Sequence, residues 1–317
     1  MLLAIMIPAL NEGETIHNVI NTLPKSISGI EEIKIVVVND GSTDNTEKAA
    51  YDAGANYVVN HGKNRGLAAA MATGLMKCLE INADIILTTD ADNQYENEEI
   101  PKLLEPIMQN KADLVLGDRQ VKKLDHMPFG KKYGNIIASK IVSRLCKEKI
   151  RDAQTGFRAL TKECALKISI MSEYTYTQEM IIQASIHKLR IKEVPITFKK
   201  RNDKSRLIKN VFSYAWKTMV TLLRTITFFV PSKTFGYLSL IIIIIGSMIV
   251  SRPLIHYFDT GNISPFIPSL LVGSIVLIVG IQTAILAIMS DMSKNNNKIM
   301  SETLYLTKKS YIEQKNK

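Results

Sequence analysis

The chain has 317 residues, 46% of them hydrophobic, which excludes a disordered protein and is enough for an α/β domain plus a further segment. Its 40 Lys and Arg against 30 Asp and Glu give a net charge of +10, which suits nucleic acid, a phosphorylated substrate or an acidic membrane as partner. The odd number of cysteines, three, and their spacing argue against both a disulfide framework and a zinc site.

Short apolar runs alternate with helical stretches over the first 120 residues. The runs typical of strands cover residues 2–10, 33–40, 55–61, 83–90 and 112–119. The stretches typical of helices cover residues 11–25, 46–54, 66–82 and 97–110. This alternation predicts an α/β domain with a Rossmann-like, mostly parallel sheet and helices on both of its faces.

Polar residues follow each of the predicted strands. They are Asn11 and Glu12, Asp40 and Gly41, Asn64 to Gly66, Asp90 to Gln94, and Arg119. In such sheets ligands bind beyond the carboxyl ends of the strands, so we expect these residues to converge on one edge. The sequence has no G-x-G-x-x-G after the first strand and no G-x-x-x-x-G-K-S/T loop, which argues against a dinucleotide-binding enzyme and a P-loop NTPase.

Asp90 and Asp92 form a D-x-D pair directly after the fourth predicted strand. Two carboxylates at this spacing can project toward one hard cation, since Mg²⁺ and Mn²⁺ prefer oxygen ligands and complete their shell with waters and substrate phosphates. The alternative is that Asp90 caps the following helix. Because Gln94 follows closely, we predict that Asp90, Asp92 and Gln94 hold Mg²⁺ or Mn²⁺ together with a diphosphate.

Several segments occur in the order typical of family 2 glycosyltransferases of the GT-A fold: IPALNEGETI, VVVNDGSTDNT, NRGLAAAMATG, TTDADNQY, GDR and RDAQTGFRA. Over residues 3–207 the chain resembles the polyprenyl-phosphate sugar synthases, a group that includes dolichol-phosphate mannose synthase, and within it the subgroup with two transmembrane helices. The resemblance implies that Asp90, Asp92 and Gln94 surround the metal and the diphosphate. It also implies that the nucleotide base and ribose are bound by Pro8, Leu10, Glu12 and Asp40.

The acceptor half of the site should carry cations rather than a strong general base, because a lipid phosphate is already ionised near neutral pH. The residues expected there are Arg119, Lys131, Asn135, Arg201 and Ser205. The family usually has arginine at Lys131, and the segment RNDKSR at 201–206 lacks the family's glycine, so Lys131 would hold phosphate as a point charge. The resemblance implies that Asp152 binds donor-sugar hydroxyls or orients the acceptor site, with a plain turn residue as the alternative.

Two long uncharged runs, at 234–251 and 260–290, follow this domain, and each can cross a bilayer as a helix. A pair of buried core helices is the alternative. Basic residues precede the first run and follow the second, while the turn between them has almost none, which predicts that both termini and the catalytic domain are cytoplasmic. Residues 207–230 have the pattern of an amphipathic helix in the membrane interface.

We therefore divide the chain into a GT-A domain at 1–206, an interfacial region at 207–232, a transmembrane hairpin at 233–291 and a basic cytoplasmic tail at 292–317. The predicted activity is inverting transfer of one sugar from a UDP- or GDP-sugar to a polyprenyl phosphate at the cytoplasmic face of the cell membrane. The product would be a lipid-linked sugar donor for glycan or glycoprotein assembly. The predicted partners are the nucleotide sugar, the polyprenyl phosphate and the bilayer, with no nucleic acid, and homo-oligomerisation stays open.

Three rival functions differ in what they require of the sequence. The first is a processive or hydroxyl-directed membrane glycosyltransferase. A processive polysaccharide synthase would need a hydroxyl-activating carboxylate together with a Q-x-x-R-W segment, but Trp216 stands without that Gln or Arg. A sugar-nucleotide pyrophosphorylase would need a glycine-rich N-terminal loop, which the sequence lacks. The third alternative is a non-catalytic membrane protein that binds nucleotide sugars. Substitutions of Asp90 and Asp92 that have no effect would favour it.

Overall fold

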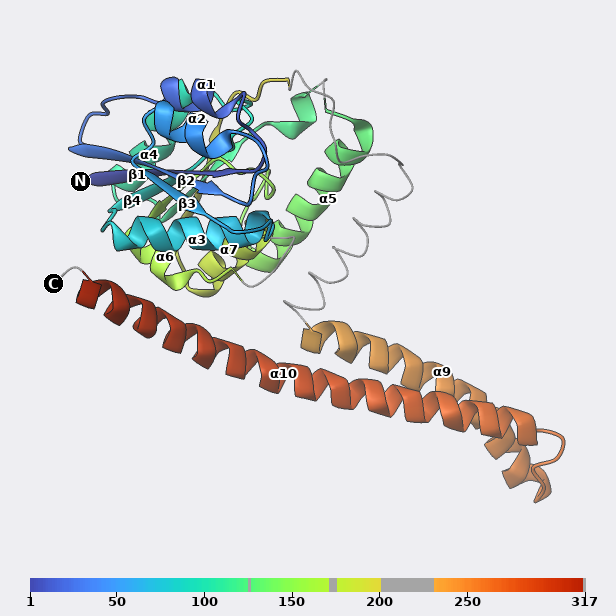
Figure 1. The fold of residues 1–317 in the computed structure, drawn as a ribbon. Coiled ribbons are helices and arrows are strands. Elements are labelled where there is room, and N and C mark those ends of the chain that lie inside the picture. Colours follow the sequence, from blue (N-terminus) through green and yellow to red (C-terminus); the bar gives the residue numbers. More distant parts are fainter. Residues whose placement is uncertain (125–126, 171–175, 201–230, 316–317) are drawn as a thin grey trace. The chain divides into compact units, whose positions relative to one another are not determined.

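The computed structural model describes residues 1–124, 127–170, 176–200 and 231–315 (Figure 1). Contacts divide the chain into two compact units, Met1–Thr218 with Ser301–Lys317, and Met219–Met300. Among the described residues, the first unit contains every strand and the second contains two long apolar helices. The predicted interfacial helix at 207–230 lies outside the described residues.

A seven-stranded sheet, in the order β3-β2-β1-β4-β6-β5-β7 among the described residues, forms the centre of the first unit. The strands are β1 (Leu2–Ala9), β2 (Glu32–Asn39), β3 (Tyr57–Asn60), β4 (Ile85–Thr88), β5 (Leu114–Asp118), β6 (Arg158–Thr161) and β7 (Ile191–Pro195). Neighbouring strands pair in parallel except at β6, which is antiparallel to both β4 and β5. The predicted mostly parallel α/β sheet is confirmed.

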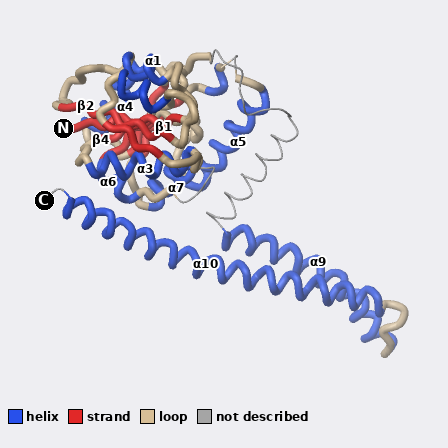
Figure 2. The backbone as a smooth tube through the Cα atoms, viewed as in Figure 1, coloured by secondary structure: helices blue, strands red, loops and turns tan. Residues whose placement is uncertain are grey.

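Helices cover both faces of this sheet (Figures 1 and 2). They are α1 (Ile16–Asn21), α2 (Thr46–Asp52), α3 (Leu67–Glu80), α4 (Ile100–Met108), α5 (Phe129–Cys146), α6 (Lys162–Lys167) and α7 (Tyr176–Ile186), with short 3-10 turns η1 (Asn97–Glu99) and η2 (Val121–Lys123). Alternate residues of β1 point to opposite faces, so Leu3, Ile5 and Ile7 share one core cluster with α1, α2 and α4. On the other face Met6 packs against Gly74 of α3, where a Cβ atom would overlap the Met6 side chain.

The carboxyl ends of β1, β2, β4 and β5 meet at one edge of the sheet, because these strands run in the same direction. The reversed strand β6 adds a further segment to this edge, since the residues that precede it enter there. Gly117 N, on β5, donates a hydrogen bond to Phe157 O at 2.9 Å. Thr88 Oγ1, at the end of β4, donates to Gly156 O at 2.5 Å. The fold thus brings the loops after β4 and β5 against residues 152–157, far away in the sequence.

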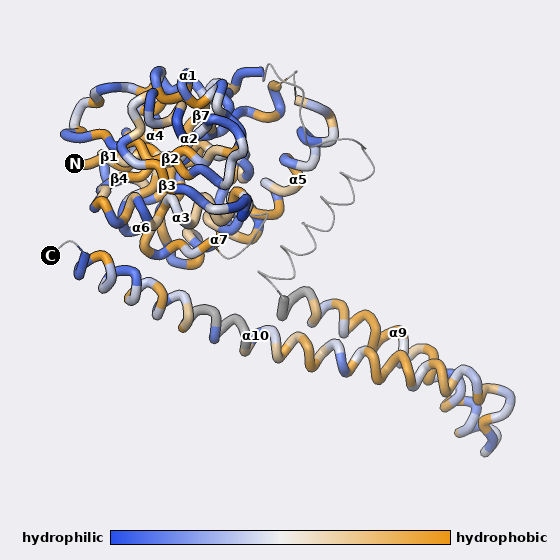
Figure 3. Tube along the Cα trace, viewed as in Figure 1, coloured by the Kyte–Doolittle hydropathy of each residue, from blue (hydrophilic) through white to orange (hydrophobic). Residues whose placement is uncertain are grey.

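Within the second unit, α9 (Pro231–Thr260) runs beside the first part of α10 (Ile267–Lys315). A Cβ atom on Gly280 would lie 2.6 Å from Ile243 Cγ1, so the missing side chain permits close helix contact. The segments Phe235–Thr260 and Ile267–Met292, 26 residues each, are long and apolar enough to span a membrane. Only 17% and 11% of their most apolar windows are buried, which argues against two core helices of a soluble protein (Figure 3).

The end of α10 belongs to the first unit. We expected a separate basic tail from residue 292, but α10 continues without a break to Lys315. Lys308 Nζ donates to Ile168 O at 2.7 Å and to Ser169 Oγ at 3.1 Å. Lys315 Nζ lies 2.8 Å from Glu80 Oε2, and Ile312 is 3% exposed. The last turns of this helix therefore pack as part of the first unit.

Replacing Ile312 with alanine is expected to lower the free energy of unfolding of the catalytic domain by about 2 kcal/mol, because a buried branched side chain is removed. The matched variant Leu306→Ala changes a side chain of the same helix that is 59% exposed, and it should cost less than about 0.5 kcal/mol. Thermal unfolding of the purified full chain in detergent compares the two. Equal melting temperatures for both variants would contradict the docking of this segment.

Candidate active site

The D-x-D pair lies in the turn after β4, at the edge where the strands end. Asp90 and Asp92 are both half-buried, and Asp92 Oδ1 accepts a hydrogen bond from Gln94 N at 3.2 Å. Desolvation by the surrounding protein, followed by the neighbouring Asp92 carboxylate, raises the pKa of Asp90 to about 6. Two carboxylates that repel each other in a partly desolvated turn fit a divalent cation, which would remove the repulsion.

Gln94 is tied to the segment after β7. Its Nε2 donates to Lys199 O at 3.1 Å, and Lys199 N donates to Gln94 O at 2.8 Å. Because the nitrogen of the side-chain amide is used in this way, the oxygen is the atom suited to a cation. Within the described ranges no three His, Cys, Asp or Glu residues gather as a metal site. A cation here would thus combine Asp90, Asp92 and Gln94 with oxygens of substrate or water.

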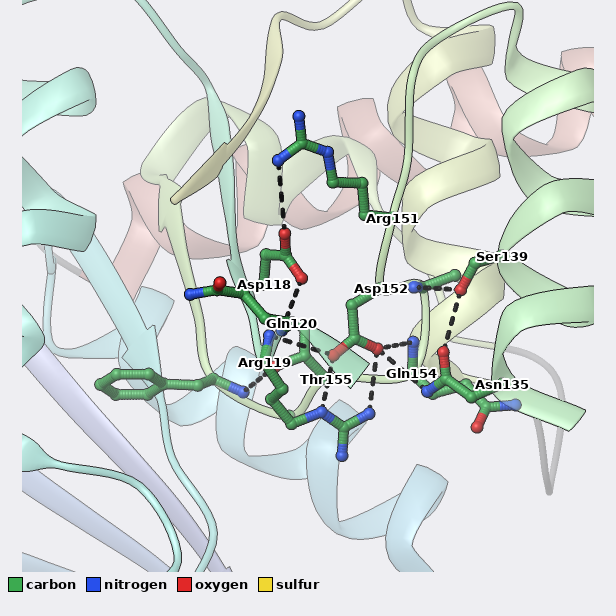
Figure 4. A network of polar contacts seen from close by, with 12 residues as sticks. Asp118, Arg119, Gln120, Asn135, Ser139, Arg151, Asp152, Gln154 and Thr155 are labelled. Carbon is green, nitrogen blue, oxygen red and sulfur yellow. Dashed lines mark hydrogen bonds and ion pairs between the residues drawn. The ribbon is translucent and has the colours of Figure 1, made fainter. Parts of the chain in front are cut away.

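Asp152 is the centre of a buried polar network (Figure 4). Arg119 Nε donates to Asp152 Oδ2 at 2.6 Å, and the Arg119 Nη2 donates to Oδ1 at 2.9 Å. Asn135 Nδ2 adds a hydrogen bond to Oδ1 at 3.0 Å. Although burial opposes ionisation, these bonds from Arg119 and then Asn135 hold the pKa of Asp152 below its usual value. Both oxygens serve other protein groups, which favours the orienting role among those predicted for Asp152.

The network reaches further along α5 than the sequence indicated. Ser139 Oγ donates to Asn135 Oδ1 at 3.2 Å and accepts from Ala153 N at 2.9 Å. Glu193 of β7 accepts hydrogen bonds from the backbone N of Arg151 and Asp152, at 2.7 and 3.0 Å. Spacing offered one signal for Ser139, because it follows Asn135 by one helical turn and lies on the same face of α5. Glu193 gave none.

The predicted acceptor cations are distributed over the described and undescribed parts of the chain. Arg119 lies in the network, and its guanidinium is 5.1 Å from the centroid of the Phe198 ring. Lys131 is half-buried in the first turn of α5, one turn before the buried Asn135. Arg201 and Ser205 lie outside the described residues. The structure therefore brings Arg119 and Asn135 together through Asp152.

The predicted nucleotide half is organised around Asp40, which follows β2 and is 3% exposed. Asp40 Oδ1 lies 2.6 Å from His61 Nδ1 and accepts from Arg65 N at 2.9 Å, while Oδ2 accepts from Gly66 N at 2.8 Å. His61, which the sequence analysis does not single out, is buried beside Asp40, and its Nε2 lies 3.0 Å from Thr73 Oγ1. Asp40 thus holds the loop between β3 and α3.

The end of β1 supplies the other predicted nucleotide residues. Pro8 is buried in β1, whereas Leu10, just after the strand, is 38% exposed. Glu12 N donates to Thr46 Oγ1 at 3.0 Å, and the Glu12 carboxylate accepts from Thr15 Oγ1 at 2.7 Å. These bonds connect the turn after β1 to the start of α2. The ends of β1 and β2 therefore form one side of the edge, next to the D-x-D turn after β4.

Comparisons with known proteins give the family and the fold. Residues 4–168 match the protein family described as glycosyl transferase family 2. A UDP-N-acetylglucosamine dolichyl-phosphate N-acetylglucosaminyltransferase of Methanococcus voltae is 35% identical over 219 residues, which cover 62% of this chain and 84% of the relative. A dolichol-phosphate mannosyltransferase of Pyrococcus furiosus is 32% identical over 68% of this chain and 62% of the relative.

A solved structure with a similar fold is glucosyl-3-phosphoglycerate synthase from Mycobacterium tuberculosis, in complex with Mn²⁺, uridine diphosphate and phosphoglyceric acid. It superposes with a TM-score of 0.54 at 21% sequence identity, over 70% of this chain and 78% of that chain. At this identity the likeness concerns the fold. It confirms the predicted GT-A architecture of the first unit.

Proposed function

The chain belongs to glycosyl transferase family 2, and we propose that it transfers one sugar from a UDP- or GDP-sugar to a polyprenyl phosphate, with inversion at the anomeric carbon. It is a glycosyltransferase by family, and relatives named for dolichyl phosphate support a polyprenyl phosphate as its acceptor. The observation that carries the proposal is the meeting of the D-x-D turn with the Arg119–Asp152 pair at one edge of the sheet. The D-x-D turn suits a nucleotide diphosphate, and the Arg119 guanidinium suits an anionic acceptor.

The proposed reaction is a single displacement. A phosphate oxygen of the acceptor attacks the anomeric carbon while the bond from that carbon to the nucleotide diphosphate breaks, so no covalent enzyme intermediate is needed. Arg119, held by Asp152, would place the acceptor phosphate, with Lys131, Arg201 and Ser205 as further contacts. Asp90, Asp92 and Gln94 would hold Mg²⁺ or Mn²⁺, whose positive charge stabilises the departing diphosphate. Pro8, Leu10, Glu12 and Asp40 would position the nucleoside.

We also propose that the two apolar helices of the second unit cross the cell membrane, with the catalytic domain and both termini on the cytoplasmic side. An exposed face of α5 supports a lipid acceptor. Phe129, Tyr133 and Ile137 recur at intervals of one turn and are 75%, 49% and 47% exposed. Such a row of exposed aromatic and aliphatic side chains suits the boundary between headgroups and acyl chains.

The test is transfer of radiolabelled sugar into organic-extractable lipid by the purified full chain in detergent. A panel of UDP- and GDP-sugars is supplied with a polyprenyl phosphate and Mn²⁺. We expect one donor to give a labelled lipid that mild acid cleaves, as a sugar phosphodiester requires. Chelation of the cation should abolish transfer, and added Mn²⁺ or Mg²⁺ should restore it, because the cation would supply the positive charge that stabilises the departing diphosphate.

Three other outcomes would contradict the proposal. If the protein binds a nucleotide sugar but no donor yields labelled lipid, the chain is a nucleotide-sugar binder or its acceptor is not a polyprenyl phosphate. If label enters a long polymer instead of a single-sugar lipid, the enzyme is a processive synthase. Transfer that persists after complete chelation would remove the cation from the proposed site.

A further inference from the structure

Tyr95 lies immediately beyond the D-x-D turn and is almost fully enclosed, with 3% of its surface exposed. Its ring stacks on Phe157, with centroids 5.0 Å apart and planes at 18°. On another side the ring meets Phe198, with centroids 5.3 Å apart. Residues 95 and 198 also form an isolated antiparallel bridge. The ring therefore has a fixed position, and its hydroxyl reaches a defined point beneath the turn.

The Tyr95 hydroxyl lies among polar groups of three residues. Gly156 N donates to the hydroxyl oxygen at 2.9 Å. The side chains of Asp90 and Thr155 lie close enough to the hydroxyl to interact with it. A phenol has one proton and two lone pairs, an amide N–H can only donate, and an ionised carboxylate can only accept. The arrangement that satisfies every group has Gly156 and Thr155 donating to Tyr95, and Tyr95 donating to Asp90.

Asp90 has little freedom to leave this hydrogen bond. A Cβ atom on Gly156 would lie 2.7 Å from Asp90 Oδ1 and 2.8 Å from Oδ2, so the carboxylate packs directly on the glycine backbone. Gly156 is itself held from the other side by Thr88, whose Oγ1 donates to its carbonyl oxygen. The carboxylate is thus confined by Gly156 and oriented by the hydroxyl of Tyr95. Without that hydroxyl, the packing remains but the directing bond is lost.

We propose that Tyr95 is a positioning residue that aims the Asp90 carboxylate at the divalent cation of the donor site. This inference rests on the cation site in the proposed function, and it assigns a residue outside the D-x-D pair and Gln94. Tyr95 itself touches neither the cation nor the sugar donor. Its effect passes through Asp90, in the way that outer hydrogen-bond partners orient the ligands of other metal sites.

The variant Tyr95→Phe removes the hydroxyl and keeps the ring between Phe157 and Phe198. We expect the dissociation constant for Mn²⁺ in the presence of UDP to rise about 10- to 100-fold, as for other lost partners of metal ligands. Transfer at limiting Mn²⁺ should fall by the same factor and recover toward the unaltered rate at saturating Mn²⁺. Equilibrium titration of Mn²⁺ by electron paramagnetic resonance measures the affinity without any turnover.

Tyr57→Phe is the matched control, since Tyr57 lies at the start of β3, where its ring packs under Lys77. A second control is the Tyr95→Phe change in an Asp90→Asn background. If Tyr95 acts through Asp90, the second change should add less than about twofold to the loss of Mn²⁺ affinity, because the two residues form one unit.

Three results would overturn the inference. Unchanged Mn²⁺ affinity in Tyr95→Phe would do so directly, and so would a loss that is fully additive with Asp90→Asn. A lowered melting temperature with a loss of rate that saturating Mn²⁺ does not repair would make Tyr95 merely structural. Failure of the wider proposal looks different: if Mn²⁺ affinity responds as expected but no lipid is labelled, the acceptor assignment fails while the role of Tyr95 stands.

Discussion

Replacing Asp92 with asparagine is expected to lower the rate of sugar transfer about 10³-fold, because loss of a cation ligand costs several kcal/mol of transition-state stabilisation. Asparagine preserves the size of the side chain and removes its charge. Asp92 is also the charged neighbour that helps to raise the pKa of Asp90, so its neutralisation relieves a repulsion. The melting temperature of the variant should therefore stay equal to that of the unaltered chain or rise. Transfer assays and thermal unfolding in the same detergent measure both quantities.

A matched carboxylate is available at the other end of the same strand. Asp84 directly precedes β4, and its Oδ2 accepts a hydrogen bond from Leu2 N at 2.8 Å. Asp84→Asn makes the same chemical change away from the candidate site and should leave the transfer rate within about twofold of normal, as a surface substitution does. Retained transfer in the Asp92 variant would remove the cation from the proposed mechanism.

The convergence of the strand ends could be predicted because it follows from strand direction alone. Once β1, β2, β4 and β5 are known to run parallel, the polar residues after them must share an edge. That reasoning placed Asp40, Asp90 and Arg119 at one edge without any knowledge of side-chain contacts. It needed only the alternation of strands and helices, which local sequence patterns predict well.

The pairing of Asp40 with His61 could not be predicted in the same way. It depends on the register of β2 with β3, in which Asn39 lies opposite Asn60, so that the next residues of the two strands become neighbours. Register is set by packing across the whole sheet, and nothing local in the sequence determines it. If the register of β2 with β3 were known, the pairing of Asp40 with His61 could be predicted.

Arg158 illustrates a second limit of the sequence. It opens β6 and is fully buried, with its guanidinium donating to the backbone oxygens of Thr155, Ala153 and Thr177 at 2.8, 3.0 and 2.7 Å. From sequence an arginine is expected at the surface, since arginine is seldom buried unless its charge is paired. Here the reversed direction of β6 turns the preceding loop around the side chain, so that backbone carbonyls take the place of solvent. No local sequence pattern indicates that this strand runs antiparallel to its neighbours.

Replacing Asp152 with asparagine is expected to lower the free energy of unfolding by about 3 kcal/mol, because it leaves the guanidinium of Arg119 buried without its partner. The side chains of the pair are only 11% and 0% exposed. The lowered pKa of Asp152 means that it is ionised at neutral pH, so the stabilisation is present there and is lost only as the pH falls through that lowered value. Thermal and denaturant unfolding at neutral pH therefore measure its full size.

Asp113 and Arg190 provide the matched exposed pair. They sit at the opposite end of β5 from Arg119, and they too make a bidentate contact, with distances of 2.9 and 2.8 Å, but Arg190 is 47% exposed. Asp113→Asn should cost less than about 1 kcal/mol, because solvent can replace the lost partner. Equal costs for the Asp113 and Asp152 variants would contradict the view that burial makes the Arg119–Asp152 pair important.

Stability and catalysis can then be separated with a double variant. Asp152→Asn combined with Arg119→Met removes both charges, so much of the lost stability should return, as it does when buried ion pairs are replaced by apolar side chains. Sugar transfer should nevertheless remain at least about 10²-fold low, because Arg119, the main cation proposed to place the acceptor phosphate, is missing. If transfer recovered together with stability, the pair would serve only the fold, and another cation, such as Lys131, would have to hold the acceptor.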